Sequence, residues 1–134
     1  MIAPAQPQLI ADEAEPLFVA NTILKQLGGE RFLRASGSYE LLGCAGGTKP
    51  QPNPWLRMQL DKRAHEGRQR LLISLMPNDL YRLDFYTPRL VNATLEVKDD
   101  WVHYTHAYAE HLRDLFASVT GLSAGRSRWA RRAE

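Results

Sequence analysis

The sequence is short of the features that would place it outside the cytoplasm. It has a single cysteine, Cys44, in 134 residues, so the chain forms no internal disulfide. No apolar run approaches the ~18–20 residues of a membrane-spanning helix. The first fifteen residues carry Asp12, Glu13 and Glu15 where a secretory signal would carry basic residues. We therefore expect a cytoplasmic protein with no membrane partner.

Sequence motifs of catalysis and cofactor binding are also missing. The stretch Gly46–Lys49 reads Gly-Gly-Thr-Lys, which reverses the Lys-Ser/Thr order of a phosphate-binding loop. Cys44 precedes it, and a nucleophilic thiolate needs a neighbouring base. Nothing in the sequence places a histidine beside that thiol, so we interpret Cys44 as inert. We expect no enzyme, no catalytic residue and no cofactor.

A metal site is considered for His103, His106 and Glu110, because imidazole and carboxylate groups suit zinc. Their spacing places all three on one face of a predicted helix. That face lies opposite the apolar stripe of the same helix and points to solvent. We therefore interpret the three residues as an ordinary polar helix face and expect no bound metal.

The two signs of charge nearly balance, at 17 Lys+Arg against 15 Asp+Glu. Without the last twelve residues the chain carries 13 basic and 14 acidic side chains. We divide it into a flexible arm, 1–14, a single α+β domain, 15–122, and a basic tail, 123–134. Arginine binds phosphate, and tryptophan stacks on bases or fills a partner's pocket, although a solubilising tail has the same composition. The candidate binding residues of the tail are Arg126, Arg128, Trp129, Arg131 and Arg132.

Hydrophobic periodicity predicts one helix at each end of the domain. The first is expected over Glu15–Leu27, where apolar residues recur every three or four positions and Gly28 supplies the cap. The second is expected over Val102–Thr120, with Tyr104 and Tyr108 in its buried stripe.

Alternating apolar and polar residues predict strands between these helices. The expected strands are Arg31–Ser38, Trp55–Asp61, Arg70–Met76, Tyr81–Thr87 and Leu90–Lys98, the last burying Val91, Ala93, Leu95 and Val97. The stretch 43–54 is rich in proline and glycine and is expected to be a flexible loop. The short connections favour an antiparallel meander of four to five strands, covered on one face by both helices. The predicted fold is therefore a two-layer α+β domain.

The uncovered face of this sheet is the second candidate binding surface. Its main candidate residues are Arg57, Arg70, Arg82 and Tyr86, and it would also present Gln59, Ser74, Asn92 and Thr94. Arginine mixed with aromatic rings is used to bind phosphates and bases. A sheet face that merely contacts water has a similar composition, so both interpretations stay open.

Three segments carry a likeness to known proteins. They are residues 21–32 (NTILKQLGGERF), 79–85 (DLYRLDF) and 108–122 (YAEHLRDLFASVTGL). Together they resemble a family of small, mostly uncharacterised proteins carried by phages, plasmids and integrative elements. The resemblance implies a mobile-element setting in the bacterial cytoplasm, and it brings no known activity and no catalytic residues.

Two functional hypotheses follow. The first is a non-enzymatic binding module that acts on nucleic acid or a nucleoprotein assembly. The alternative is a protein-binding inhibitor of a host system, such as an anti-defence factor. Salt distinguishes them, because phosphate binding weakens steeply with salt and an apolar protein interface weakens little. The partner's identity and the oligomeric state are left open.

Overall fold

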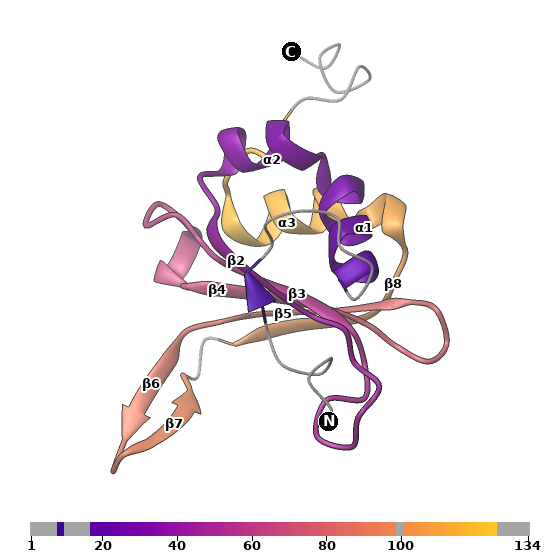
Figure 1. Cartoon of the computed structure of the whole chain (residues 1–134). Coiled ribbons are helices and arrows are strands. Elements are labelled where there is room, and N and C mark those ends of the chain that lie inside the picture. Colours follow the sequence, from indigo (N-terminus) through magenta and orange to yellow (C-terminus); the bar gives the residue numbers. More distant parts are fainter. Residues whose placement is uncertain (1–7, 10–16, 99–100, 126–134) are drawn as a thin grey trace.

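The computed structural model describes residues 8–9, 17–98 and 101–125. Within these ranges, three α-helices lie over one face of an antiparallel sheet (Figure 1). The predicted two-layer α+β architecture, with helices before and after the strands, is confirmed. Among the described residues, none of the helices is long and apolar enough to cross a membrane.

The first two helices pack as a pair, α1 (Phe18–Leu27) and α2 (Gly29–Ser36). Gly28 ends α1 as predicted, but the chain continues into α2 where we expected a strand over 31–38, so that prediction is wrong. A helix is favoured over a strand here because it buries Phe32 and Ser36, which lie one turn apart on the same side. The predicted start of the first helix, residues 15–16, lies outside the described residues.

In the described part of the chain, six strands form the main sheet, in the order β1-β2-β3-β4-β5-β8, and every neighbouring pair is antiparallel. Their bounds are β1 Gln8–Leu9, β2 Tyr39–Cys44, β3 Trp55–Gln59, β4 Arg70–Leu75, β5 Tyr81–Tyr86 and β8 Val102–Ala107. Two further strands, β6 (Pro88–Val91) and β7 (Thr94–Val97), pair only with each other and form a hairpin between β5 and β8. Of the predicted arm 1–14, the structure describes only β1.

The second helix is shorter than predicted, because its expected first half is strand β8. Val102 and Tyr104 lie opposite Phe85 and Leu83 of β5. β-Branched and aromatic residues suit this half-buried position beside a strand. The true helix, α3, spans Leu112–Thr120 after a short 3₁₀ turn, and Tyr108 is exposed rather than part of a buried stripe.

The expected last strand, Leu90–Lys98, is also wrong, because the chain reverses at Asn92 and Ala93 to make the β6–β7 hairpin. Both residues have positive φ, 50° and 64°, as a two-residue type I′ turn requires. Leu95 and Val97, which we expected to be buried, are 65% and 43% exposed.

The core lies between the sheet and the helices. The phenyl rings of Phe32 on α2 and Phe116 on α3 meet edge to face, with ring centres 4.8 Å apart. Other fully buried core residues are Ile23, Leu27, Leu56, Met58, Leu71, Ile73, Leu83, Phe85 and Leu112. Because alternate residues of β3, β4 and β5 supply this core, the residues between them face the other way.

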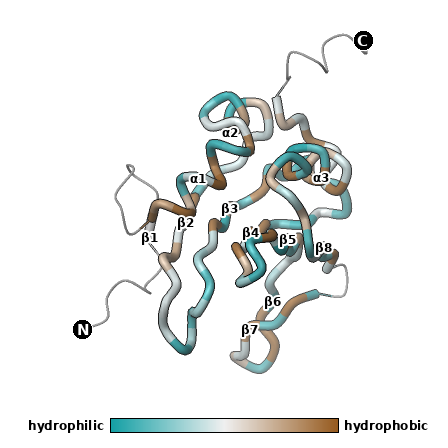
Figure 2. Tube along the Cα trace, turned by 90° about the vertical axis from the view of Figure 1, so that its right-hand side faces the viewer, coloured by the Kyte–Doolittle hydropathy of each residue, from teal (hydrophilic) through white to brown (hydrophobic). Residues whose placement is uncertain are grey.

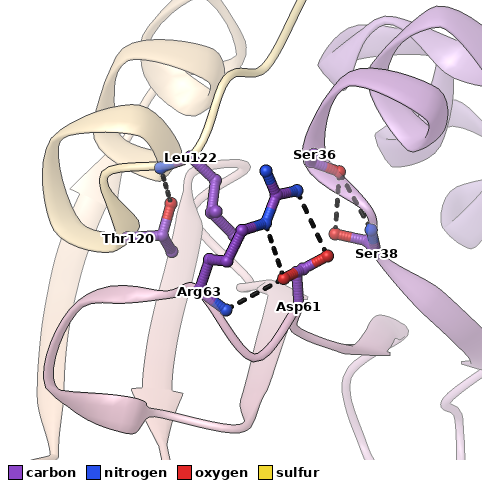
Figure 3. Close-up of polar contacts among 6 residues, drawn as sticks. All are labelled: Ser36, Ser38, Asp61, Arg63, Thr120 and Leu122. Carbon is purple, nitrogen blue, oxygen red and sulfur yellow. Dashed lines mark hydrogen bonds and ion pairs between the residues drawn. The ribbon is translucent and has the colours of Figure 1, made fainter.

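The turn after β3 packs against the C-terminal ends of α2 and α3 (Figure 3). Gly37 after α2 and Gly121 after α3 have φ of 74° and 72°, and a Cβ on them would overlap with Asp61 and His65 respectively. Asp61 accepts hydrogen bonds from the backbone N–H and the Nε of Arg63, both at 2.9 Å. These bonds lower the pKa of the Asp61 carboxyl. The glycine caps therefore let this turn close against the helix layer.

Candidate functional site

The face of the sheet that carries no helix is the candidate site, which we call the open face. Its members alternate with buried residues on the same strands. The pairing register places Arg57, Leu72, Asp84 and His103 in one row across β3, β4, β5 and β8, and Gln59, Arg70 and Tyr86 in the next. Arg82 and Trp101 join these rows through their contacts with Asp84.

Asp84 organises the centre of the open face. Its carboxylate accepts hydrogen bonds from Arg82 Nε at 3.0 Å and from Trp101 Nε1 at 3.0 Å. Asp84 is buried, and Arg82 keeps about a third of its side chain in solvent. The hydrogen bonds from Arg82 to Asp84 raise the pKa of the guanidinium, so this group is always cationic. A single buried carboxylate thus orients one cation and one indole ring.

Aromatic rings gather beside this carboxylate. The guanidinium carbon of Arg82 lies 5.9 Å from the ring centre of Trp101, within cation–π range. The imidazole of His103 lies tilted against the same indole, with ring centres 4.9 Å apart. Trp101 is nevertheless 43% exposed. Its indole is therefore held by its edge while part of its surface remains accessible.

Two further arginines leave their charge available. Arg57 makes no hydrogen bond or ion pair with a described residue. Arg70 donates from Nε to the side-chain oxygen of Gln59 at 3.2 Å. In this orientation the Gln59 amide nitrogen also donates to the Gln69 carbonyl oxygen at 3.2 Å. Counting only the residues that the structure describes, three arginines against one carboxylate give the open face a formal charge of +2. This charge is the electrostatic requirement for holding a phosphate chain.

Two segments project on the same side of the sheet as the open face. The β6–β7 hairpin and the loop between β2 and β3 both extend away from the helix layer, as Figures 1 and 2 show. In this loop, Gln51 Oε1 accepts a hydrogen bond from Nε1 of Trp55, the first residue of β3, at 2.8 Å. Cys44, predicted to lie in this loop, is instead the buried last residue of β2.

The structure places the predicted residues Arg57, Arg70, Arg82 and Tyr86 together on the open face. Two lesser members of that prediction do not belong there, because Asn92 and Thr94 lie at the tip of the hairpin. Their assignment followed from the wrong last strand. The predicted tail residues, Arg126, Arg128, Trp129, Arg131 and Arg132, lie outside the described residues.

Sequence reasoning missed Trp101 and His103, because it assigned the segment from 102 onwards to a helix. Alternation was the available signal: Val102 and Tyr104 face the core, whereas Trp101 and His103 face the other way. The same error grouped His103, His106 and Glu110 on a helical face that does not exist. Among the described residues, the structure brings together no three His, Cys, Asp or Glu side chains able to hold a metal ion.

The chain was compared with protein-family models, with curated proteins and with solved structures, and none of these comparisons found a match.

Proposed function

We propose that this protein is a non-enzymatic module that binds single-stranded nucleic acid across the open face of its sheet. The observation that carries the proposal is the joint placement of Arg57, Arg70 and Arg82 with the rings of Tyr86 and Trp101 on one face without helices. Arginines follow a phosphate backbone, and aromatic rings stack on bases.

A single strand suits this surface better than a duplex. Stacking on Trp101 or Tyr86 requires bases that have left their own stack, and single strands provide them. Reading a duplex groove usually calls for a helix or a narrow β-ribbon, whereas the open face spans four strands, β3, β4, β5 and β8. The hairpin and the loop that project beside it would border the path of the strand.

The cellular setting belongs to the same proposal. The resemblance of residues 21–32, 79–85 and 108–122 to mobile-element proteins favours a phage- or plasmid-borne protein in the bacterial cytoplasm. Such elements expose single strands during replication and transfer, which would supply the ligand. We attach no catalytic step to this role.

A second candidate function is the protein-binding inhibitor of a host system. The β6–β7 hairpin favours it, because Leu90 and Leu95 lie opposite each other and are 72% and 65% exposed. Figure 2 shows these apolar segments well away from the helices. Exposed apolar side chains beside one another mark protein contacts.

Binding to a fluorescent twelve-residue oligothymidylate, measured at several salt concentrations, tests the first proposal. Replacing both Arg57 and Arg70 by glutamine should reduce the magnitude of the slope of log affinity against log salt by up to about 1.4, from about 0.7 per phosphate contact on a single strand. The charge-matched control replaces Lys25 and Arg34, exposed on the helix layer, by glutamine.

The control should keep the wild-type slope. Trp101→Ala should weaken binding by about 1–3 kcal/mol if the indole stacks on a base. The proposal fails if the protein does not bind the strand, or if the open-face and helix-layer variants change the slope equally. Salt-insensitive capture of a host protein through the hairpin would support the second candidate instead.

A further inference from the structure

A pocket of about 330 Å³ opens at the end of the open face, next to the turn between β4 and β5. Its lining residues are Met76, Pro77, Asn78, Arg82, Thr105 and His106. The volume lies at the low end of the range for small-molecule sites, which suits one planar ring. Arg82 belongs both to this pocket and to the Asp84–Trp101 cluster, so the pocket continues the proposed strand-binding surface.

Two irregular backbone segments form the walls. On one side the chain reverses after Met76, whose N–H donates to Leu80 O at 2.9 Å, while Asn78 Oδ1 accepts the Leu80 N–H at 3.1 Å. On the other side the pairing of β5 with β8 is irregular, and His106 has a φ of 63°. A residue with a side chain rarely adopts that conformation, and such residues cluster at ligand sites.

Arg82 presents a fixed donor edge beside this pocket. Its Nε and Nη2 donate to Asp84, at 3.0 Å and 3.1 Å for the closer contacts. Its Nη1 makes no hydrogen bond with a described residue. Within the described part of the chain, no acceptor meets the edge formed by Nη1 and the second N–H of Nη2, and this edge matches a ligand with two adjacent acceptors.

We propose that this pocket holds one guanine base, with Arg82 donating to its O6 and N7. That pairing is the commonest specific contact between arginine and a base. The Met76 side chain and the Pro77 ring offer apolar contact to the base plane, and the His106 imidazole offers a stacking surface. Other bases lack the two adjacent acceptors: adenine places an amino donor next to N7, and the pyrimidines have no N7.

The inference rests on the proposed function, since the guanine would belong to the strand that crosses the open face. It adds base preference to a surface that otherwise binds any sequence. A free guanine nucleotide offers the same ring, so the experiment includes it as a separate ligand.

The test measures the affinity of the wild-type protein for oligothymidylate with one central dG, dA or dC, and for unsubstituted oligothymidylate. We expect the dG strand to bind about 5- to 160-fold more tightly than the other three, the range for one bidentate arginine–guanine contact. Arg82→Lys keeps the charge but loses the planar fork, so the preference should fall to about one. Met76→Trp, which fills the pocket from its apolar wall, should remove the preference by a second route, and thermal melting checks that both variants fold.

The outcomes separate the two proposals. Equal, salt-dependent binding of all four strands overturns the guanine pocket and leaves the open face as a binding surface. Binding of guanosine monophosphate that is lost in Arg82→Lys, without binding of any strand, supports the pocket and overturns the strand proposal. Absence of binding to every strand and to the nucleotide overturns both.

Discussion

The two faces of the one sheet differ in almost every respect. Towards the helices, β3, β4 and β5 present fully buried apolar side chains such as Met58, Ile73 and Phe85. Away from the helices, the residues between them form an arginine and aromatic surface around the carboxylate of Asp84. One set of alternate residues stabilises the fold, and under the proposed function the other set contacts the ligand. Substitutions should therefore separate stability from binding.

The largest expected effect is on stability, from the helix-covered face. Phe116→Ala removes a fully buried ring that packs on Phe32, and we expect it to lower the free energy of unfolding by about 3–5 kcal/mol. Urea unfolding followed by circular dichroism measures the change. Phe18→Ala is the matched control, because Phe18 is 67% exposed and should change stability by no more than about 0.5 kcal/mol. Equal losses in the two variants would contradict the assigned core.

The next effect tests whether Asp84 fixes the positions of Arg82 and Trp101 on the open face. Asp84→Ala leaves Arg82 and Trp101 without their shared acceptor, and we expect a loss of about 1–3 kcal/mol. The fluorescence of Trp101 should report a more solvated indole. Glu110→Ala, an exposed acid in the 3₁₀ turn, serves as the control and should leave both stability and emission unchanged. An unchanged emission in Asp84→Ala would show that the indole is positioned by other contacts.

A smaller effect depends on pH. Tyr81 donates from its hydroxyl to Gln26 Oε1 at 2.7 Å, and burial raises the pKa of its phenol above the unfolded value. The neutral phenol therefore stabilises the fold fully below pH about 10, and this contribution is lost as pH rises through the higher pKa of the folded state. Tyr81→Phe should cost about 0.5–1.5 kcal/mol at pH 8.

The difference between wild type and Tyr81→Phe should narrow above pH about 10, as urea titrations at both pH values would show. Comparison with the variant cancels the ionisation of the other tyrosines and lysines. A difference that stays constant over this range would mean that the Tyr81 phenol does not titrate differently in the folded state.

The smallest effect on stability is expected from the hairpin. Replacing Leu90 and Leu95 together by serine removes two exposed apolar side chains and should alter the free energy of unfolding by less than about 1 kcal/mol. If the strand-binding proposal holds, affinity for oligothymidylate should be unchanged. A large loss of strand affinity would move the binding surface from the open face to the hairpin.

The layered fold was predictable because its signals are local. The alternation in Trp55–Asp61, Arg70–Met76 and Tyr81–Thr87 gave β3, β4 and β5 to within two residues at either end, and with them Arg57, Arg70, Arg82 and Tyr86 on a common face. The apolar spacing likewise predicted α1 and its end at Gly28. Periodicity suffices where every second or fourth residue meets the core.

The errors arose where tertiary pairing decides the structure. The segment Val102–Ala107 has a helix-compatible pattern and becomes β8 only because the edge of β5 offers it hydrogen bonds. Residues 31–36 alternate passably as a strand but become α2, since Phe32 then reaches Phe116 from another helix. These choices depend on partners distant in sequence, which propensity does not record. The pocket at Arg82 and His106 depends on both the turn and the β8 irregularity, so it was beyond sequence reasoning.

The most direct test of the strand-binding claim uses the indole N–H signals of the three tryptophans in a nitrogen-15 NMR titration with oligothymidylate. Trp101 is exposed on the open face, whereas Trp55, on the same side of the sheet, is buried and bonded to Gln51. Trp129 belongs to the basic tail. We predict a progressive shift of the Trp101 signal, lost in the Arg57, Arg70 double variant, and little change at Trp55. A titration that moves the Trp129 signal alone, with Trp101 unaffected at saturation, would assign binding to the tail and contradict the account.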